Sequence, residues 1–563
     1  MSYNVTEIEE WIAHDPEEST AAEVRDLLVK SEGGDAEARA ELEDRFQGSL
    51  EFGTAGLRGS MAGGPYRMNR AVVRRAAYGL TAWLKEKVGS DALVVIGYDA
   101  RYNSADFAAD TAAIVTAAGL RAKIMPRALP TPVLAFAVRH FGADAGVMVT
   151  ASHNPAKDNG YKVYTGGRAI DENGRGAQIV PPVDSEIAAQ IKAAPFADEI
   201  PLAKSGWETI DEEFIDTYVS TAVATICPET PRDLKIVYTA MHGVGAQIMR
   251  RVLADAGFAD VVEVAEQNTP DPDFPTVSFP NPEEAGALDL AIALAEKENA
   301  DLVIASDPDA DRASVAVPVD GVWTQLSGDE IGAILGEQVA DRVQEHGETG
   351  TLANSIVSSQ LLEQIAKHHG LNYEATLTGF KWISRAHNIA FGYEEAIGFC
   401  VDPTHVKDKD GLSAGLLIAE TAAKLKTEGK GLRDELDRIA GMIGSLYLTG
   451  PVTIRVEDLS IIPATMEKVR HNPPTVLLGS QVASVVDLSN GTDQLPPTNA
   501  IVIHTEAGDR AIVRPSGTEP KVKCYLEVIV PINGRPLSDV RAEASERLAS
   551  FKAEMGEALK LDA

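Results

Sequence analysis

The sequence predicts a multidomain α/β protein that ends in a smaller α+β domain. Short apolar runs alternate with alanine-rich stretches of helical period in three parts of the chain, and this alternation is typical of βαβ units. From residue 447 the pattern changes to strands of antiparallel type, followed by a helix at 537–559. A length of 563 residues is enough for about three to five domains.

Breaks in this alternation set the predicted domain boundaries. The first part of the chain is acidic and helical, and we expect it to pack on the first domain. An acid-rich stretch at 195–213 separates the first α/β domain from the second, and the turn-rich stretch 268–284 interrupts the second. The predicted parts are a helical extension at 1–50, domain I at 51–210, domain II at 211–325, domain III at 326–446 and domain IV at 447–563.

Three predicted strands end in polar loops. The strand that ends at 97–101 is followed by a helical stretch at 104–119, and the segment 233–245 repeats this plan with a helix that begins near its end. The strand 302–305 is preceded by an amphipathic helix at 282–299. Ligands of open α/β sheets bind beyond the carboxyl ends of the strands, so each of these loops is placed for chemistry.

Charge and composition narrow the class of partner. The chain has 51 Lys and Arg against 84 Asp and Glu, a net charge of −33, so we expect neither a nucleic-acid nor a membrane partner but a small molecule. An anionic ligand would need locally clustered cations. The N-terminal stretch has no basic start and no apolar core, which predicts a cytoplasmic protein. The three cysteines lie far apart and are expected to be reduced core thiols.

The stretch "SDPDADR" is the strongest candidate for a metal site. Asp307, Asp309 and Asp311 alternate directly after an apolar run, so three carboxylates can face one hard cation such as Mg²⁺. The alternative is a solvated acidic turn, which the position at a strand end disfavours. An EF-hand does not fit, because Arg312 stands where that loop needs glycine.

Ser152 lies in "TASHNP", after the strand 146–149 and before a second strand entered by a tight turn at 159–160. We expect an exposed loop here, with His153 pointing away from Ser152. The stretch lacks the glycines of a nucleophile elbow, which argues against a serine hydrolase. A phosphorylated serine fits better, because its added charge of about −1.5 to −2 would complete the shell of the metal.

Further loops carry candidate ligand contacts. In "RPSGTEPK", Arg514, Ser516, the Gly517 backbone and Thr518 can surround a phosphate, although a surface turn is an alternative. Arg58, in a glycine-rich stretch, is a candidate anion contact. "TGFKWI" and "GYEEAIG" contribute Lys381 and Glu394, but by composition alone each is simply a loop.

The motifs "FGTAGLRG", "TASHNP", "SDPDADR", "EEAIG" and "RPSGTEPK" together resemble those of the α-D-phosphohexomutase family, in order and spacing, over nearly the whole chain. The resemblance is strongest to the branch of phosphoglucomutases with phosphopentomutase activity. It implies a heart-shaped protein of four domains, three related α/β domains with mixed sheets and a C-terminal α+β domain. It also implies a monomer or dimer.

The resemblance assigns roles to residues of this chain. It implies catalytic residues Ser152, His153, Arg58 and Lys162, and one Mg²⁺ per site held by Ser152, Asp307, Asp309 and Asp311. It implies that substrate is bound by Arg312, Gly379, Lys381, Glu394, Lys409, Arg514, Ser516, Gly517 and Thr518.

The activity that the resemblance implies is that of a phosphosugar mutase. A phosphoserine would exchange a phosphoryl group between C1 and C6 of a hexose phosphate, with glucose 1-phosphate and glucose 6-phosphate as the pair and a sugar bisphosphate as primer and intermediate. Ala396 stands where several hexose-specific members carry serine, so phosphomannomutase or phosphopentomutase specificity remains an alternative. A magnesium-dependent phosphatase and a non-catalytic sugar-phosphate-binding protein are further alternatives.

Overall fold

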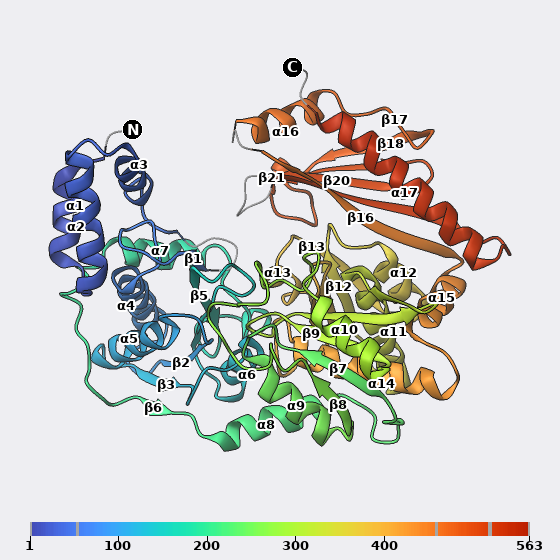
Figure 1. Cartoon of the computed structure of the whole chain (residues 1–563), viewed down its shortest axis with the longest axis horizontal. Helices are drawn as coiled ribbons and strands as arrows, with labels where there is room; N and C mark the ends of the chain where they lie inside the picture. Colours follow the sequence, from blue (N-terminus) through green and yellow to red (C-terminus); the bar gives the residue numbers. More distant parts are fainter. Residues whose placement is uncertain (1–2, 52–55, 457–459, 516–520, 561–563) are drawn as a thin grey trace. The chain divides into compact units, whose positions relative to one another are not determined.

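The chain forms two compact units in this computed structural model, which describes residues 3–51, 56–456, 460–515 and 521–560. Unit 1 comprises Met1–Leu326 and Ile397–Thr427, and unit 2 comprises Ser327–Ala396 and Glu428–Ala563. Figure 1 shows the helices and strands of both units and labels many of them. In the part of the chain that the structure describes, no helix has both the length and the apolar character needed to span a membrane.

Unit 1 begins with three helices that pack on each other through a small apolar core of Ile8, Val24, Leu28 and Leu42. Asn4 and Asp35 cap the first and third helices with side-chain oxygens. The backbone of Gly63 joins these helices to the domain that follows, because its N–H donates to Glu23 and its carbonyl accepts from Arg45. The three helices are α1 Val5–His14, α2 Glu18–Glu32 and α3 Ala36–Arg45.

The first α/β domain is built on a six-stranded sheet in the order β1-β5-β4-β2-β3-β6. Strands β4, β2, β3 and β6 are parallel, whereas β5 and β1 are antiparallel to their neighbours. The strands are β1 Leu57–Ser60, β2 Leu93–Tyr98, β3 Arg121–Ile124, β4 Ala145–Val149, β5 Asp158–Thr165 and β6 Glu208–Thr209. The helices are α4 Arg70–Lys87, α5 Ser104–Ala117, α6 Thr131–His140 and α7 Val183–Lys192, with a 3-10 turn η1 at Glu172–Gly174.

One local prediction in this domain is wrong. Asn159 and Gly160 do not form the turn but lie in β5, where they pair with Gly59 and Arg58 of β1. A side chain at Gly160 would meet the carbonyl oxygen of Thr150 at 2.5 Å, so glycine permits close strand packing here rather than a turn.

The second α/β domain has a five-stranded sheet in the order β11-β10-β9-β7-β8, of which β9, β7 and β8 are parallel. Its strands are β7 Lys235–Thr239, β8 Asp260–Glu263, β9 Leu302–Ser306, β10 Ala313–Val319 and β11 Val322–Gln325. Its helices are α8 Glu212–Val223, α9 Gly245–Asp255 and α10 Asp289–Glu298. Strand β15 Gly398–Cys400 and helix α14 Gly411–Thr427 belong to the same unit, and α14 packs on α9, β9 and β10.

Unit 2 contains a third α/β domain and an antiparallel domain. In the former, β12 Thr351–Ser355 pairs in parallel with β13 Asn372–Thr376 and β14 Ile389–Glu394. Its helices are α11 Gly328–Glu345, α12 Leu361–His368, α13 Phe380–Ile383 and α15 Leu432–Ile443.

The C-terminal domain has a sheet in the order β16-β21-β20-β19-β18-β17 with antiparallel pairing throughout, and α17 packs on β16 and β21 (Figure 1). Its strands are β16 Ser445–Arg455, β17 Val476–Leu477, β18 Ser480–Asp487, β19 Ile501–Thr505, β20 Arg510–Pro515 and β21 Lys521–Pro531. Its helices are α16 Ile461–His471 and α17 Leu537–Leu559, with a 3-10 turn η2 at Leu488–Asn490.

The predicted fold class is therefore confirmed: three α/β domains with mixed sheets precede a C-terminal domain of antiparallel strands and helices. The prediction for the cysteines is wrong in one case. Cys400 and Cys524 are buried as expected, but Cys227 is exposed.

Candidate active site

The loop 150–157, here called the serine loop, joins the carboxyl end of β4 to β5 and holds Ser152. We expected an exposed loop here, and this prediction is wrong, because Ser152 is only 3% exposed. Its N–H donates to Thr150 Oγ1 at 2.9 Å, and its backbone has a φ of 53°, in the left-handed region. The sequence therefore places the serine correctly at a strand end but not its degree of burial.

Arg101 holds this loop in place and was not among the predicted site residues. Its guanidinium donates to four backbone carbonyl oxygens, those of Ser152 (2.6 Å), Asn154 (2.6 Å), Pro155 (2.8 Å) and Asp158 (3.1 Å). Asp99, two residues before it, forms an ion pair with its Nε at 3.3 Å. The sequence could have indicated Arg101, because it ends the polar stretch that follows β2. Strand β2 is the parallel neighbour of β4, which the serine loop follows.

His153 contradicts its predicted direction. Its Nδ1 lies 3.2 Å from Ser152 Oγ, because the left-handed backbone at Ser152 ends the side-chain alternation of an extended chain. Burial, and after it the positive charges of Arg312 and Arg58, holds the pKa of His153 well below its ordinary value. The imidazole next to the hydroxyl is therefore neutral around neutral pH.

The three aspartates follow β9 and lie against the serine loop. Ser152 Oγ donates to Asp307 Oδ2 at 3.0 Å, although the two residues are 155 positions apart. The segment is a turn rather than an extended chain, because Ala310 adopts a φ of 54° and donates its N–H to the Asp307 carbonyl. One carboxylate oxygen from each of Asp307, Asp309 and Asp311 nevertheless lies within 4.8 Å of the others, and all three side chains are fully buried.

Two lysines and a threonine pair with these carboxylates. Lys162 Nζ, from β5, lies 2.7 Å from Asp309 Oδ2 and 2.9 Å from Asp311 Oδ2, and Lys409 Nζ lies 3.3 Å from Asp311 Oδ2. Thr131, the first residue of α6, donates its hydroxyl to Asp309 Oδ2 at 2.6 Å. Thr131 was missed because the apolar helix that it opens carries no charged motif.

The carboxylates still need positive charge. Asp309 Oδ1 and Asp311 Oδ1 are buried and have no hydrogen-bond partner among the residues that the structure describes. Burial, and after it the charges of Asp309 and Asp311, raises the pKa of Asp307 well above its ordinary value. Buried anionic oxygens without donors are costly unless a cation pairs with them. Asp307, Asp309 and Asp311, here called the acidic triad, can therefore hold a metal ion, and their carboxylate oxygens suit a hard cation.

Two predicted cations flank this group. Arg58, in β1, donates from Nη1 to Asn154 Oδ1 of the serine loop at 3.0 Å. Arg312 donates its backbone N–H to Asp307 Oδ1 at 3.0 Å, and its guanidinium lies between Glu283 (3.7 Å) and Asp311 (3.9 Å). The structure thus brings together the predicted members of unit 1: Ser152, His153, Arg58, Lys162, Asp307, Asp309, Asp311, Arg312 and Lys409.

The remaining predicted residues belong to unit 2. Gly379 has a φ of 108° and precedes α13, in which Lys381 Nζ lies 5.9 Å from the centre of the Trp382 ring. Glu394 is half-buried at the end of β14. Arg514, at the end of β20, donates to Thr378 Oγ1 and so joins the predicted phosphate loop to the stretch before α13. The predicted contacts Ser516, Gly517 and Thr518 lie outside the described residues.

An α/β fold in which a hydroxyl faces three buried carboxylates beside two lysines is characteristic of an enzyme that transfers phosphoryl groups with the help of a metal ion. The chain belongs to the phosphoglucomutase/phosphomannomutase family, because its segments match the four domains of that family in order. Residues 49–198 match alpha/beta/alpha domain I, 212–320 match domain II, 327–440 match domain III and 452–529 match the C-terminal domain.

Individual relatives span most of the chain. It is 47% identical over 463 residues to a probable phosphomannomutase of Haemophilus influenzae, covering 82% of this chain and 93% of the relative. It is 38% identical over 585 residues to phosphoribomutase of Saccharomyces cerevisiae, covering 92% and 91%. A putative phosphomannomutase of Thermus thermophilus, 24% identical, has the same fold with a TM-score of 0.67 over 89% of this chain and 99% of that one.

These findings confirm the resemblance on which the sequence-based predictions depended. The protein is an enzyme, an intramolecular phosphotransferase of the isomerase class, and a member of a family of phosphomutases.

Proposed function

We propose that this enzyme is a phosphosugar mutase that moves a phosphoryl group between C1 and C6 of a hexose phosphate, through a phosphoserine at Ser152. The observation that carries the proposal is the hydrogen bond from Ser152 Oγ to Asp307 Oδ2, which sets a hydroxyl at the edge of the acidic triad. A phosphoryl group on this oxygen would face the same carboxylates and the lysines that pair with them.

We propose one Mg²⁺ per site, held by Asp307, Asp309, Asp311 and an oxygen of the phosphorylated Ser152. The buried Oδ1 atoms of Asp309 and Asp311, which lack a hydrogen-bond partner in the described part of the chain, support this ligand set. Mg²⁺ would supply Lewis-acid polarisation and neutralise charge on the phosphoryl oxygens.

The surrounding side chains would orient and neutralise the moving group. In each half-reaction the bond between phosphorus and the serine oxygen breaks while a bond to a sugar hydroxyl oxygen forms, or the reverse, and the hydroxyl proton moves to the oxygen that is released. Neutral His153, whose Nδ1 lies 3.2 Å from Ser152 Oγ, would accept or return that proton. Lys162, Arg58 and Arg312 contribute positive charge around the site.

The residues proposed to bind the sugar are those that the family resemblance assigns to substrate. Glu394 is proposed to accept hydrogen bonds from sugar hydroxyls. Lys409 is proposed to contact the sugar as well, and Gly379 and Lys381 are proposed as further substrate contacts. The phosphate that does not react would be held by Arg514, Ser516, Gly517 and Thr518. The contact of Arg514 with Thr378 supports this clamp, because it sets the guanidinium beside the stretch that contains Gly379. A sugar bisphosphate serves as intermediate and as primer.

We propose glucose 1-phosphate and glucose 6-phosphate as the substrate pair. The alternative substrates are mannose phosphates and ribose phosphates. The names of the two relatives, a probable phosphomannomutase and a phosphoribomutase, favour activity beyond glucose. Ala396 favours it as well, because it offers no hydroxyl to the sugar.

The test compares the purified protein on glucose, mannose and ribose 1-phosphates, each with Mg²⁺ and a trace of the matching bisphosphate. We expect isomerised sugar phosphate from at least the glucose substrate, and we expect Ser152→Ala to lower kcat by about 10³-fold or more. Ser220→Ala, on the exposed face of α8, is the matched control and should leave kcat unchanged. Release of free phosphate without isomerised product, or an active Ser152→Ala variant, would contradict the proposal.

A further inference from the structure

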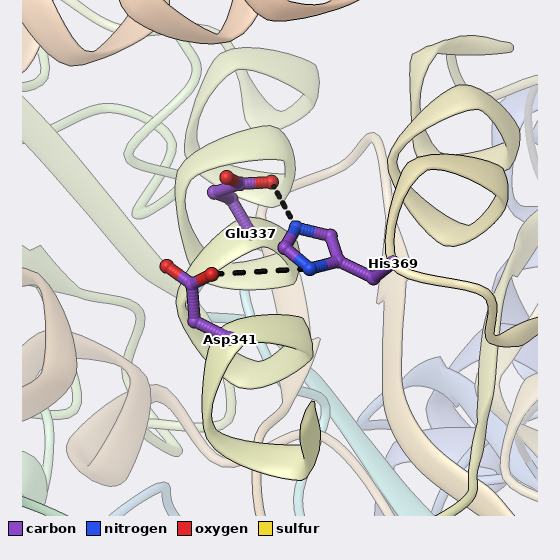
Figure 2. Close-up of side chains that lie close together, drawn as sticks. All are labelled: Glu337, Asp341 and His369. Carbon is purple, nitrogen blue, oxygen red and sulfur yellow. Dashed lines mark hydrogen bonds and ion pairs between the residues drawn. The ribbon is translucent and has the colours of Figure 1, made fainter. Parts of the chain in front are cut away.

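Unit 2 contains a second group of residue types that can bind metal ions: Glu337 and Asp341 of α11, and His369 after α12 (Figure 2). Glu337 lies 3.0 Å from Nε2 of the imidazole, whereas Asp341 lies 3.8 Å from Nδ1, so a single ion cannot contact all three residues. Gln344 lies 3.1 Å from the same Nδ1, and Arg438 donates to the second oxygen of Glu337 at 2.7 Å. The group therefore needs no metal ion to tie α11 to the end of α12.

The stretch 268–284, here called the turn-rich loop, lies between β8 and α10 of the second α/β domain and has no role in the reaction proposed above. It nevertheless contacts two residues of the first domain that surround Ser152. The guanidinium carbon of Arg101 lies over the Phe274 ring, 5.0 Å from its centre. The ring of His153 lies 6.2 Å from that of Phe279. The turn-rich loop therefore joins the second domain to the serine loop of the first.

The turn-rich loop is itself fixed close to the acidic triad. The N–H of Asp271 donates to the carbonyl oxygen of His242 at 3.0 Å, and Thr276 Oγ1 lies 2.7 Å from His242 Nε2. Two residues after this histidine, the N–H of Val244 donates at 2.8 Å to the carbonyl oxygen of Pro308, within the turn that carries the triad. The loop is therefore braced, through the segment after β7, on the turn that would hold the metal ion.

Phe274 is the residue through which this brace reaches the serine loop. Its side chain is 4% exposed, and its backbone has a φ of 47°, which is unusual for a bulky residue. Beside it, the hydroxyl of Tyr102 donates to both carboxylate oxygens of Asp273 at 3.1 Å. An aromatic face attracts a guanidinium and packs against its plane. The ring therefore limits where the guanidinium of Arg101 can lie, and with it the carbonyl groups that Arg101 holds.

We propose that Phe274 is a positioning residue for phosphoryl transfer. From the domain that carries the acidic triad, its ring fixes the guanidinium of Arg101 and thereby keeps Ser152 Oγ beside Asp307. The inference rests on the proposed transfer through Ser152, and it adds a residue that acts through Arg101 rather than on the reacting atoms.

The second α/β domain offers a matched control at Phe258. This ring is 2% exposed and lies 5.3 Å from the guanidinium carbon of Arg232. Like Arg101, Arg232 donates to four backbone carbonyl oxygens, but none of them belongs to the serine loop or the acidic triad: those of Cys227, Thr230, Pro231 and Ala256. Phe258→Leu therefore removes an equivalent ring from an equivalent arginine elsewhere in the same domain.

The kinetic test compares Phe274→Leu with Phe258→Leu, using glucose 1-phosphate, Mg²⁺ and a trace of the bisphosphate. Both variants should have a lower Tm, because each loses a buried ring. Only Phe274→Leu should lower kcat, by about tenfold or more, since displacement of the reacting oxygen slows transfer. Its KM should change less than about threefold, because the proposed sugar contacts are untouched.

A double-mutant cycle tests whether Phe274 acts through Arg101. In the Arg101→Lys background, Phe274→Leu should lower kcat by less than about threefold, because the interaction is already lost. A full tenfold loss in that background would overturn the proposal, and so would equal losses of kcat in Phe274→Leu and Phe258→Leu.

Hydrogen–deuterium exchange of the serine loop gives a readout that does not depend on activity. The amide of Ser152 is hydrogen-bonded to Thr150, so a looser loop should exchange it faster. Phe274→Leu should speed this exchange about tenfold or more, and Phe258→Leu should not. Tyr102→Phe, at an exposed position that does not threaten folding, should speed it about twofold.

Unchanged exchange in both Phe274→Leu and Tyr102→Phe would overturn the proposal, as would a wild-type kcat in Phe274→Leu. A wild type without mutase activity would contradict the proposed function instead. In that case the exchange of the serine loop would still decide whether Phe274 holds it in place.

Discussion

Glu395 is a half-buried acid next to the proposed sugar contact Glu394. Its Oε2 accepts hydrogen bonds from Ser355 Oγ and Ser358 Oγ, both at 3.0 Å, and its N–H donates to Ser358 Oγ at 3.1 Å. Burial, and after it the charges of Glu394 and Asp329, raises the pKa of Glu395 from 4.5 to about 7. The loop therefore changes its charge close to neutral pH.

This shift predicts how stability depends on pH. Between pH 4.5 and about 7 the folded state holds a proton on Glu395 that the unfolded chain releases, so the free energy of unfolding falls as pH rises through this window and levels off above it. Glu395→Gln should remove that part of the slope. The free energy of unfolding of the variant, relative to that of the wild type, should therefore rise from about pH 5 to about pH 8. Urea unfolding at both pH values measures it.

The control for this prediction is Glu348→Gln, an exposed acid in the same unit, which should follow the wild type at both pH values. Parallel slopes for Glu395→Gln and the wild type would show that Glu395 is ionised throughout this range.

At single residues, the sequence predicts chemistry better than orientation. The positions of Ser152 and the acidic triad after strands follow from apolar runs and were predicted correctly. The left-handed backbone at Ser152 was not, because no residue pattern around it marks a positive φ in a non-glycine residue, and the direction of His153 was lost with it.

At the scale of elements, the serine loop depends on Arg101, which follows β2. One guanidinium satisfies three carbonyl oxygens of the serine loop and that of Asp158 at the start of β5, and its planar fork suits this geometry.

Arg101→Lys should therefore lower kcat strongly. An ammonium group keeps the charge but cannot donate to four carbonyls in fixed directions, so Ser152 would shift, and a displacement of about 1 Å can cost about 10²-fold in rate. The measurement is kcat together with Tm. Arg127→Lys, a half-buried arginine paired with Glu212 in the same unit, is the control. Wild-type kcat in Arg101→Lys would mean that the loop holds its shape without the fork.

Most helices and strands were predictable, and the exceptions have local causes. The helix α17 spans Leu537–Leu559 as predicted, and α9 begins at Gly245. The helix predicted at 282–299 is shorter, Asp289–Glu298, because the chain before it forms turns closed by Glu284 N–H to the Asn281 carbonyl and Ala287 N–H to the Glu284 carbonyl. Helical periodicity does not distinguish such turns from a first helical turn.

At the scale of the whole molecule, positive charge is clustered locally, as an anionic ligand of this acidic chain would need. A chain with a net charge of −33 repels an anionic ligand, yet unit 1 gathers five cationic side chains around the serine loop and the acidic triad. These are Arg58, Arg101, Lys162, Arg312 and Lys409. Local clustering of cations therefore offsets the global charge where a phosphate is proposed to bind.

The assembly of the site was predictable only in part. Composition and periodicity predict strands that end in polar loops, but not which loops meet, because the partners are far apart in sequence. The family resemblance supplied that pairing for Ser152 and the acidic triad. It did not supply Thr131 or Arg101, whose contacts depend on the packing of α6 and β2. The domain boundaries proposed from the sequence stay a prediction.

The central claim is that Ser152 carries the transferred phosphoryl group beside the acidic triad. Its most direct test is mass spectrometric mapping of phosphate on the intact enzyme after incubation with glucose 1,6-bisphosphate and Mg²⁺. We expect phosphate on the peptide that contains Ser152, its loss when a sugar monophosphate is then added in excess, and much less of it when Mg²⁺ is chelated. Turnover by an enzyme whose Ser152 is never phosphorylated, or phosphate on a different residue, would contradict the account.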